Sequence, residues 1–154
     1  MAKSRKRSDS SVTPKPPEPP VFFVDRCLGR HEFPAPLRDA GLRVEVHDDH
    51  FADDCADDDW LPAVGKYGWV VINRDLKIRY RAIEKEAALS NGVRMISLTA
   101  RRLSAGELGE AFVASSDRVM RFLGAQRLPF IATMTRGGDL RIVATTRGRS
   151  RDRR

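Results

Sequence analysis

Cysteine and long apolar runs are both scarce in this sequence. The 154 residues include two cysteines, Cys27 and Cys55, too few for a disulfide framework, so a reducing compartment is expected. No apolar run approaches the ~20 residues that a transmembrane helix requires. The basic N-terminus lacks the apolar segment that would make it a signal peptide. We therefore expect a cytoplasmic protein without a membrane partner.

Motifs for zinc, calcium and nucleotide binding are also missing. The acidic stretch 48–60 lacks the central Gly and final Glu of a calcium loop, and no Gly-rich phosphate-binding motif is present. Haloacid-dehalogenase-type phosphatases have a second Asp two residues after the first, where this chain has Cys27. The residues that could be imagined as a zinc site lack the paired spacing of one: Cys27, His47, His50 and Cys55. Zinc and phosphatase chemistry remain minor alternatives.

The net charge of +7 belongs to the two ends of the chain. Residues 1–20 carry +3 and residues 146–154 carry +4, whereas residues 21–145 balance 18 basic against 18 acidic side chains. The first segment also has five prolines and four serines, so it cannot bury enough surface to offset its ordering entropy. We predict a disordered basic arm (1–20), one domain (21–145) and a disordered basic tail (146–154). The arm serves either solubility or contact with nucleic acid phosphates.

Alternating apolar segments predict an α/β domain between residues 21 and 145. Strands are expected at 21–24, 42–47, 69–72 and 93–98, then at 129–135 and 139–145 around a turn at 136–138. Helices are expected at 34–40, 58–68, 75–89 and 104–124, the last opened by a capping box at Ser104 and Glu107. Since strands alternate with helices, we predict a compact, mainly parallel sheet with helices on both faces and a C-terminal hairpin.

Aspartates follow three of the predicted strands. Asp25 follows strand 21–24, Asp48 and Asp49 follow strand 42–47, and Asp75 comes shortly after strand 69–72. Parallel strands end at the same edge of a sheet, and ligands bind beyond their carboxyl ends, so these carboxylates should lie close together. The helix that leads into the third strand should start at this edge too. Three more acids open that helix: Asp57, Asp58 and Asp59.

A divalent cation would neutralise this acidic region. Residues 44–65 contain eight acidic residues and no Lys or Arg. Oxygen ligands without Cys or His favour Mg²⁺ or Mn²⁺. For Asp53, Asp54 and Asp58 we favour surface acidity and helix capping over metal binding. These explanations do not account for Asp25, which directly follows an all-apolar strand, so we interpret Asp25 as a metal ligand.

Three segments resemble, in order, the PIN-like domain of VapC-type toxins: FFVDRCLG, DDDWL and GWVVINRDLKIR. The resemblance covers roughly residues 21–145. That family has an Asp at the end of its first strand, matched by Asp25, and an Asp shortly before a Trp-Leu pair, matched by Asp57. A Thr/Ser-x-Asp element follows its next strand and is matched by Asp75, with Asn73 in place of the hydroxyl residue.

The resemblance implies a Mg²⁺- or Mn²⁺-dependent endoribonuclease, often a toxin held by an antitoxin protein. It assigns catalysis and metal binding to Asp25, Asp57 and Asp75. Asp48, Asp49 and Asp59 are further candidate metal ligands, the first two by position for an acid of the family that has no clear match. RNA, an antitoxin and a second copy of this chain are the implied partners. A catalytically silent nucleic-acid-binding or regulatory module is the alternative, because Asn73 departs from the family pattern.

A basic run surrounds Asp75. Helical spacing places Lys77 and Arg81 on one face, with Arg74 nearby. These side chains form either a solvated helix face or an RNA-binding rim that contacts phosphates without reading sequence. We interpret the two tryptophans, Trp60 and Trp69, as core anchors rather than as platforms for base stacking.

Overall fold

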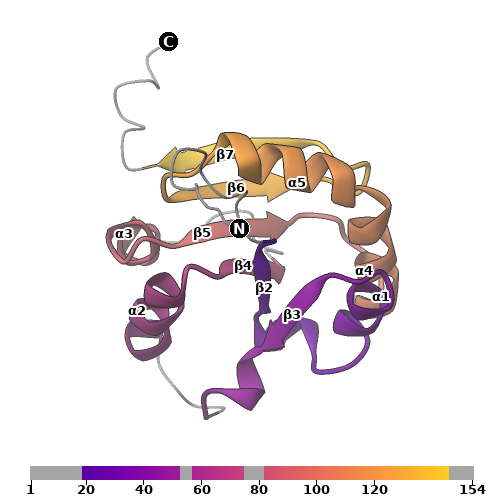
Figure 1. Ribbon diagram of the computed structural model, residues 1–154, viewed down its shortest axis with the longest axis horizontal. Coiled ribbons are helices and arrows are strands. Elements are labelled where there is room, and N and C mark those ends of the chain that lie inside the picture. The colour runs from indigo at the N-terminus through magenta and orange to yellow at the C-terminus, as the bar shows by residue number, and fades with distance from the viewer. Residues whose placement is uncertain (1–18, 53–56, 75–81, 146–154) are drawn as a thin grey trace, which may run out of the picture.

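A single mixed sheet forms the centre of the protein. The computed structural model describes residues 19–52, 57–74 and 82–145. Its strands lie in the order β3-β2-β4-β5-β6-β7, all parallel except the last (Figure 1). They are β2 (Val21–Val24), β3 (Arg43–Val46), β4 (Val70–Arg74), β5 (Arg94–Leu98), β6 (Phe130–Met134) and β7 (Leu140–Thr145). The predicted α/β class, parallel sheet and C-terminal hairpin are confirmed.

Helices cover both faces of this sheet (Figure 1). The helices are α1 (Pro34–Asp39), α2 (Asp57–Tyr67), α3 (Ala82–Ser90), α4 (Ala105–Ala114) and α5 (Ser116–Ala125). Helices α2 and α3 pack on one face, whereas α1, α4 and α5 pack on the other. No helix in the described ranges has the length and apolarity to cross a bilayer.

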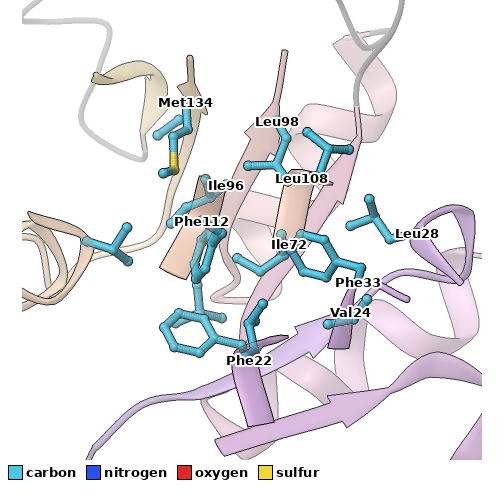
Figure 2. Packing of buried hydrophobic residues seen from close by; sticks show 14 of the residues in the cluster. Phe22, Val24, Leu28, Phe33, Ile72, Ile96, Leu98, Leu108, Phe112 and Met134 are labelled. Carbon is cyan, nitrogen blue, oxygen red and sulfur yellow. The ribbon is translucent and has the colours of Figure 1, made fainter. Parts of the chain in front are cut away.

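The alternation of β2 divides the core into two clusters. Phe22 and Val24 belong to the cluster under α1, α4 and α5, and Figure 2 shows them beside Phe33 and Phe112. Phe23 points the other way and packs with the apolar residues of α2 and α3. The side chains of Phe22, Phe23 and Val24 are all 0% exposed. The apolar run therefore behaves as predicted, as a strand buried on both faces.

The long helix predicted over 104–124 is two helices. The capping box at Ser104 and Glu107 is present and starts α4. The helix ends at Ser115, whose φ of −108° and ψ of 14° leave the helical range. Serine competes with helical hydrogen bonding, and the Ser115 side chain lies directly against Gly138 in the β6–β7 turn. The prediction of one helix was wrong because a contact distant in sequence interrupts it.

Close packing of α2 against the turn after α3 generates the first prediction. A Cβ added to Gly65 would overlap the backbone carbonyl of Asn91, which cannot rotate away as a side chain could. We expect Gly65→Ala to lower the free energy of unfolding by about 1–3 kcal/mol, the usual cost of overpacking. Urea unfolding followed by circular dichroism measures it.

Gly124→Ala is the matched control. Gly124 lies in α5, and nothing lies within 4 Å of the position its Cβ would take. Because Ala is favoured over Gly in helices by up to about 1 kcal/mol, this variant should be as stable as the wild type or more so. Equal stability of the two variants would contradict the packing described for Gly65.

Candidate active site

The carboxyl ends of three strands meet at one edge of the sheet. β2 lies between β3 and β4, with Val24 paired to Val46 on one side and to Ile72 on the other. Asp25 is the next residue of β2, and its N–H donates to the Ile72 carbonyl at 3.0 Å. The neighbouring strands lead into His47 and Asn73 at the same level. Asp25 therefore stands in the middle of this carboxyl edge.

A tight turn fixes the Asp25 carboxylate where the strand ends. The chain turns into a 3₁₀ helix at Arg26–Leu28, and the Asp25 side chain caps it by accepting the Cys27 N–H at 3.3 Å. Asp25 is partly buried, and no Lys or Arg among the described residues forms an ion pair with it. A carboxylate removed from water without a cationic partner is costly, so this position is suited to a bound cation.

The Cys27 thiol is coupled to the same carboxylate. Although Cys27 is exposed at the surface, partial desolvation of its thiol, the negative charge of Asp25 and a hydrogen bond to Asp25 together raise the pKa of Cys27 to about 12, while Arg74 acts in the opposite direction. The thiol is therefore protonated at neutral pH and acts as a donor to Asp25. This role could not be predicted from the sequence, because it depends on how the turn after β2 folds back.

Asp48 and Asp49 have a cationic partner, Arg30. They lie in a 3₁₀ helix, His47–Asp49, directly after β3. The Arg30 guanidinium lies 3.9 Å from the Asp48 carboxylate and 3.1 Å from that of Asp49. His47 is 1% exposed, and its Nδ1 lies 3.5 Å from Asp48 Oδ1. Their role as further metal ligands remains a prediction.

The side chain of Asn73 forms a hydrogen bond with a residue of the neighbouring strand. It pairs in register with Ser97 of β5, whose hydroxyl donates to Asn73 Oδ1 at 2.7 Å. The Asn73 amide donates to Met95 Sδ at 3.4 Å. Both members of the polar pair are buried, at 7% and 1% exposure. Sequence reasoning missed Ser97, although a lone serine within an apolar strand was a visible signal.

Arg74, the last residue of β4, directs its guanidinium toward the loop before α4. Its Nη2 donates to the Leu103 carbonyl at 2.6 Å, while its buried Nε has no hydrogen-bond partner among the residues that the structure describes. Contact of Arg74 with RNA remains a prediction. Lys77, Arg81 and Asp75 lie outside the described residues.

Helix α2 starts at the carboxyl edge. The Trp60 ring, in its first turn, lies 5.7 Å from the ring of His47 at that edge. At its other end, the Tyr67 ring lies 4.6 Å from Trp69, just before β4 begins. The start of α2 at Asp57 therefore lies at the same carboxyl edge of the sheet as Asp25.

Convergence of the three predicted metal ligands remains a prediction. The structure does not describe the side chains of Asp57 and Asp59 or any part of Asp75. Within the described residues, no group of three His, Cys, Asp or Glu side chains is placed to hold a metal. Asp25 is thus the one predicted catalytic ligand whose surroundings are defined.

Comparison with known proteins supports the resemblance noted in the sequence. The model of the PIN like domain family matches residues 20–100, more than half of the chain. The chain belongs to the PIN-like domain family. It is 32% identical over 120 residues to "Putative ribonuclease VapC45" of Mycobacterium tuberculosis (strain ATCC 25618 / H37Rv), covering 73% of this chain and 84% of that protein. No solved structure was found to match.

The family match covers the candidate active site of this PIN-like domain. Range 20–100 includes β2 to β5, with Asp25, the Asp57 position and the Asn73–Ser97 pair. Helices α4 and α5 and strands β6 and β7 follow the matched range. They complete the sheet and cover the apolar face behind β2.

The coupling of Cys27 to Asp25 generates the second prediction. Alkylation proceeds through the thiolate, so the pKa of about 12 should make Cys27 react slowly at pH 8. The alkylation rate should keep rising beyond pH 10 without a plateau. Unfolding in urea should accelerate the reaction, because the thiol then returns toward its ordinary pKa of 9.0.

Pulsed alkylation with mass spectrometry of the Cys27 peptide measures these rates. Asp25→Asn is the informative variant, since it removes a negative charge that raises the pKa of Cys27. Its alkylation should be faster than that of the native wild type at the same pH. A wild-type rate that levels off near pH 9 would show that the thiol is not held by Asp25.

Proposed function

We propose that this PIN-like domain is a Mg²⁺-dependent endoribonuclease with Asp25, Asp57 and Asp75 as its metal ligands. The observation that carries the proposal is the Asp25 carboxylate, partly buried at the carboxyl edge without a cationic partner among the described residues. The name of the relative, which calls it a ribonuclease, supports RNA as the substrate. The start of α2 on the same side of the sheet supports Asp57 as a second ligand.

The chemistry of the residues fits Mg²⁺ or Mn²⁺. Carboxylate oxygens are the ligands that these hard cations prefer. When bound, the cation would polarise a phosphoryl oxygen and activate water. The turn at Arg26–Leu28 would keep Asp25 in one orientation during this reaction.

Basic residues beside the site would bind the substrate. We propose Arg74, Lys77 and Arg81 as contacts to RNA phosphates, which position a strand without reading its sequence. Arg74 supports this role because it ends β4 at the carboxyl edge. Arg30 would also favour binding, since it neutralises Asp48 and Asp49, which would otherwise repel phosphates.

The biological role we propose is that of a toxin controlled by an antitoxin protein, as implied by the resemblance to VapC-type toxins. The alternative is a nucleic-acid-binding or regulatory module without catalysis. One observation favours that alternative. Asp48 and Asp49, the candidates for the unmatched acid of the family, are ion-paired with Arg30, and metal binding would have to replace that pairing.

Substitution of Asp25 tests the function. Asp25→Asn should lower Mg²⁺-dependent cleavage of RNA by more than about 100-fold. Mutation of residues that only hydrogen-bond to a metal ligand already lowers activity or metal affinity by about 10–100-fold. Mg²⁺ should raise the melting temperature of the wild type and leave that of the variant unchanged. Cleavage of a fluorescent RNA with Mg²⁺ or with EDTA, together with thermal melts, measures both effects.

Asp139→Asn is the matched control. Asp139 is 83% exposed in the β6–β7 turn, where it pairs with Arg118, so the same loss of charge should leave cleavage unchanged. Asp49→Asn tests whether Asp49 is a further metal ligand. The variant should lose cleavage if Asp49 binds the metal and keep it if Asp49 is only a surface acid. An Asp25→Asn protein that cuts RNA at the wild-type rate would end the catalytic assignment, and cleavage that persists in EDTA would end the metal assignment.

A further inference from the structure

A groove of about 480 Å³ lies at the opposite edge of the sheet, where the parallel strands begin. Its walls come from residues 19–21, from the end of α2 and the residues before β4, and from the last turn of α5. The volume is within the range of about 300–1,000 Å³ found for ligand sites. None of the proposed catalytic residues lines this groove.

Three arginines give the groove a positive charge. Arg43 and Arg94 are the first residues of β3 and β5, and Arg127 follows α5. Arg94 is held in place, because its Nη1 donates to the carbonyls of Leu123 and Gln126 at 3.3 and 3.1 Å. Burial and the charge of Arg127 lower the pKa of Arg94. No carboxylate within the described ranges forms an ion pair with Arg94 or Arg127, so an anion here would relieve their repulsion.

Both basic ends of the chain join the domain at this edge. β2 begins here at Val21, and antiparallel β7 ends here, since Thr145 pairs with Phe130, the first residue of β6. Residues 1–18 and 146–154 each contain five Lys or Arg. Like charges would disfavour these segments as occupants of the groove. The partner must instead be an anion large enough to benefit from the whole basic edge.

Aromatic rings line the groove next to the arginines. Tyr67 is 59% exposed, and its ring lies 4.6 Å from that of Trp69 at an interplanar angle of 33°. Trp69 is only partly buried and stacks on Phe23 at 5.7 Å. Of the two tryptophans predicted to be core anchors, Trp60 is buried and Trp69 reaches the groove. Exposed aromatic faces beside arginines suit nucleotides, whose bases stack while their phosphates pair.

We propose that this groove binds single-stranded RNA away from the site of cleavage, with a base stacked on Tyr67 and phosphates bound by Arg43, Arg94 and Arg127. An acidic protein segment would use the arginines but would not need the aromatic faces. The choice of RNA rests on the proposed ribonuclease function, whereas binding does not require the metal site. β2 separates the groove from Asp25 by about 13 Å, at about 3.3 Å per residue, so one RNA molecule can contact both edges.

Binding of a fluorescent single-stranded RNA to the full chain in EDTA tests the proposal without any cleavage. The double variant Tyr67→Ala/Arg127→Gln should bind about 5- to 100-fold more weakly, as expected for the loss of one stacked base. Arg127→Gln alone should reduce the slope of log Kd against log salt by about 0.7, the value for one phosphate of a single strand. Tyr67→Phe keeps the ring and should bind like the wild type.

Arg121→Gln is the matched control, because Arg121 is exposed on α5 and does not line the groove. It should leave the affinity less affected than Arg127→Gln does. Circular dichroism melts show whether the variants fold. If Tyr67→Ala is unstable, Arg127→Gln alone tests the groove through its salt slope. Wild-type affinity and salt slope in the double variant would overturn the proposal.

Two competitors separate RNA from other anions. Polyglutamate that displaces the RNA while Tyr67→Ala binds RNA normally would assign the groove to an acidic protein and overturn the proposal. If a mononucleotide competes as well as the RNA, mole for mole, the groove binds a small ligand. That result would also overturn the proposal. The two proposals fail separately: a chain that never cuts RNA but loses RNA binding in the double variant retains the groove and loses the catalytic function.

Discussion

Parallel pairing of β2 with both of its neighbours is the constraint on which the arrangement of this PIN-like domain depends. Phe22 and Phe23 are fully buried on opposite faces, so β2 can exist only inside a sheet that helices cover on both sides. Such a strand has no place for a charged side chain along its length. Charged groups of this strand are therefore confined to its ends. Because β2 to β6 run the same way, their carboxyl ends lie at one edge and their amino ends at the other.

This separation places carboxylates together with Arg30 and Arg74 at the carboxyl edge, and a groove lined by arginines at the other edge. Acidic residues follow β2 and β3 at the carboxyl edge, while Arg43 and Arg94 begin β3 and β5 at the other. RNA would be repelled by uncompensated carboxylates and attracted by the arginines. A cation bound at Asp25 would reverse the first effect, and the basic tails would strengthen the second. The two proposals thus describe one molecule that attracts a polyanion at one edge and acts on it at the other.

Features set by the chain's local pattern could be predicted, and those set by distant contacts could not. The buried strand before Asp25 and the capping box at Ser104 follow from neighbouring residues alone. The break at Ser115 depends on Gly138 in a distant turn, so the helical pattern continues across it in the sequence. Trp69 looks like any core tryptophan until the groove beside it is known. For the candidate site, the position of Asp25 at a strand end was predictable, but its bonds to Cys27 depend on the folded turn.

The asparagine at position 73 shows why a departure from a family pattern needs a structural explanation before a functional one. Asn73 is buried, so its amide must be satisfied inside the protein, and the Ser97 hydroxyl and Met95 sulfur do so. Removal of the Ser97 hydroxyl would take one hydrogen bond from this buried amide, at a cost of about 0.5–1.5 kcal/mol. Asn73 and Ser97 therefore belong together, as one polar link between β4 and β5. Asn73 Oδ1 already accepts from Ser97, so a metal bound there would share this oxygen with the Ser97 hydroxyl. The contribution of Asn73 is to hold the end of β4 in register, directly before Arg74, and that contribution is compatible with an active site at Asp25.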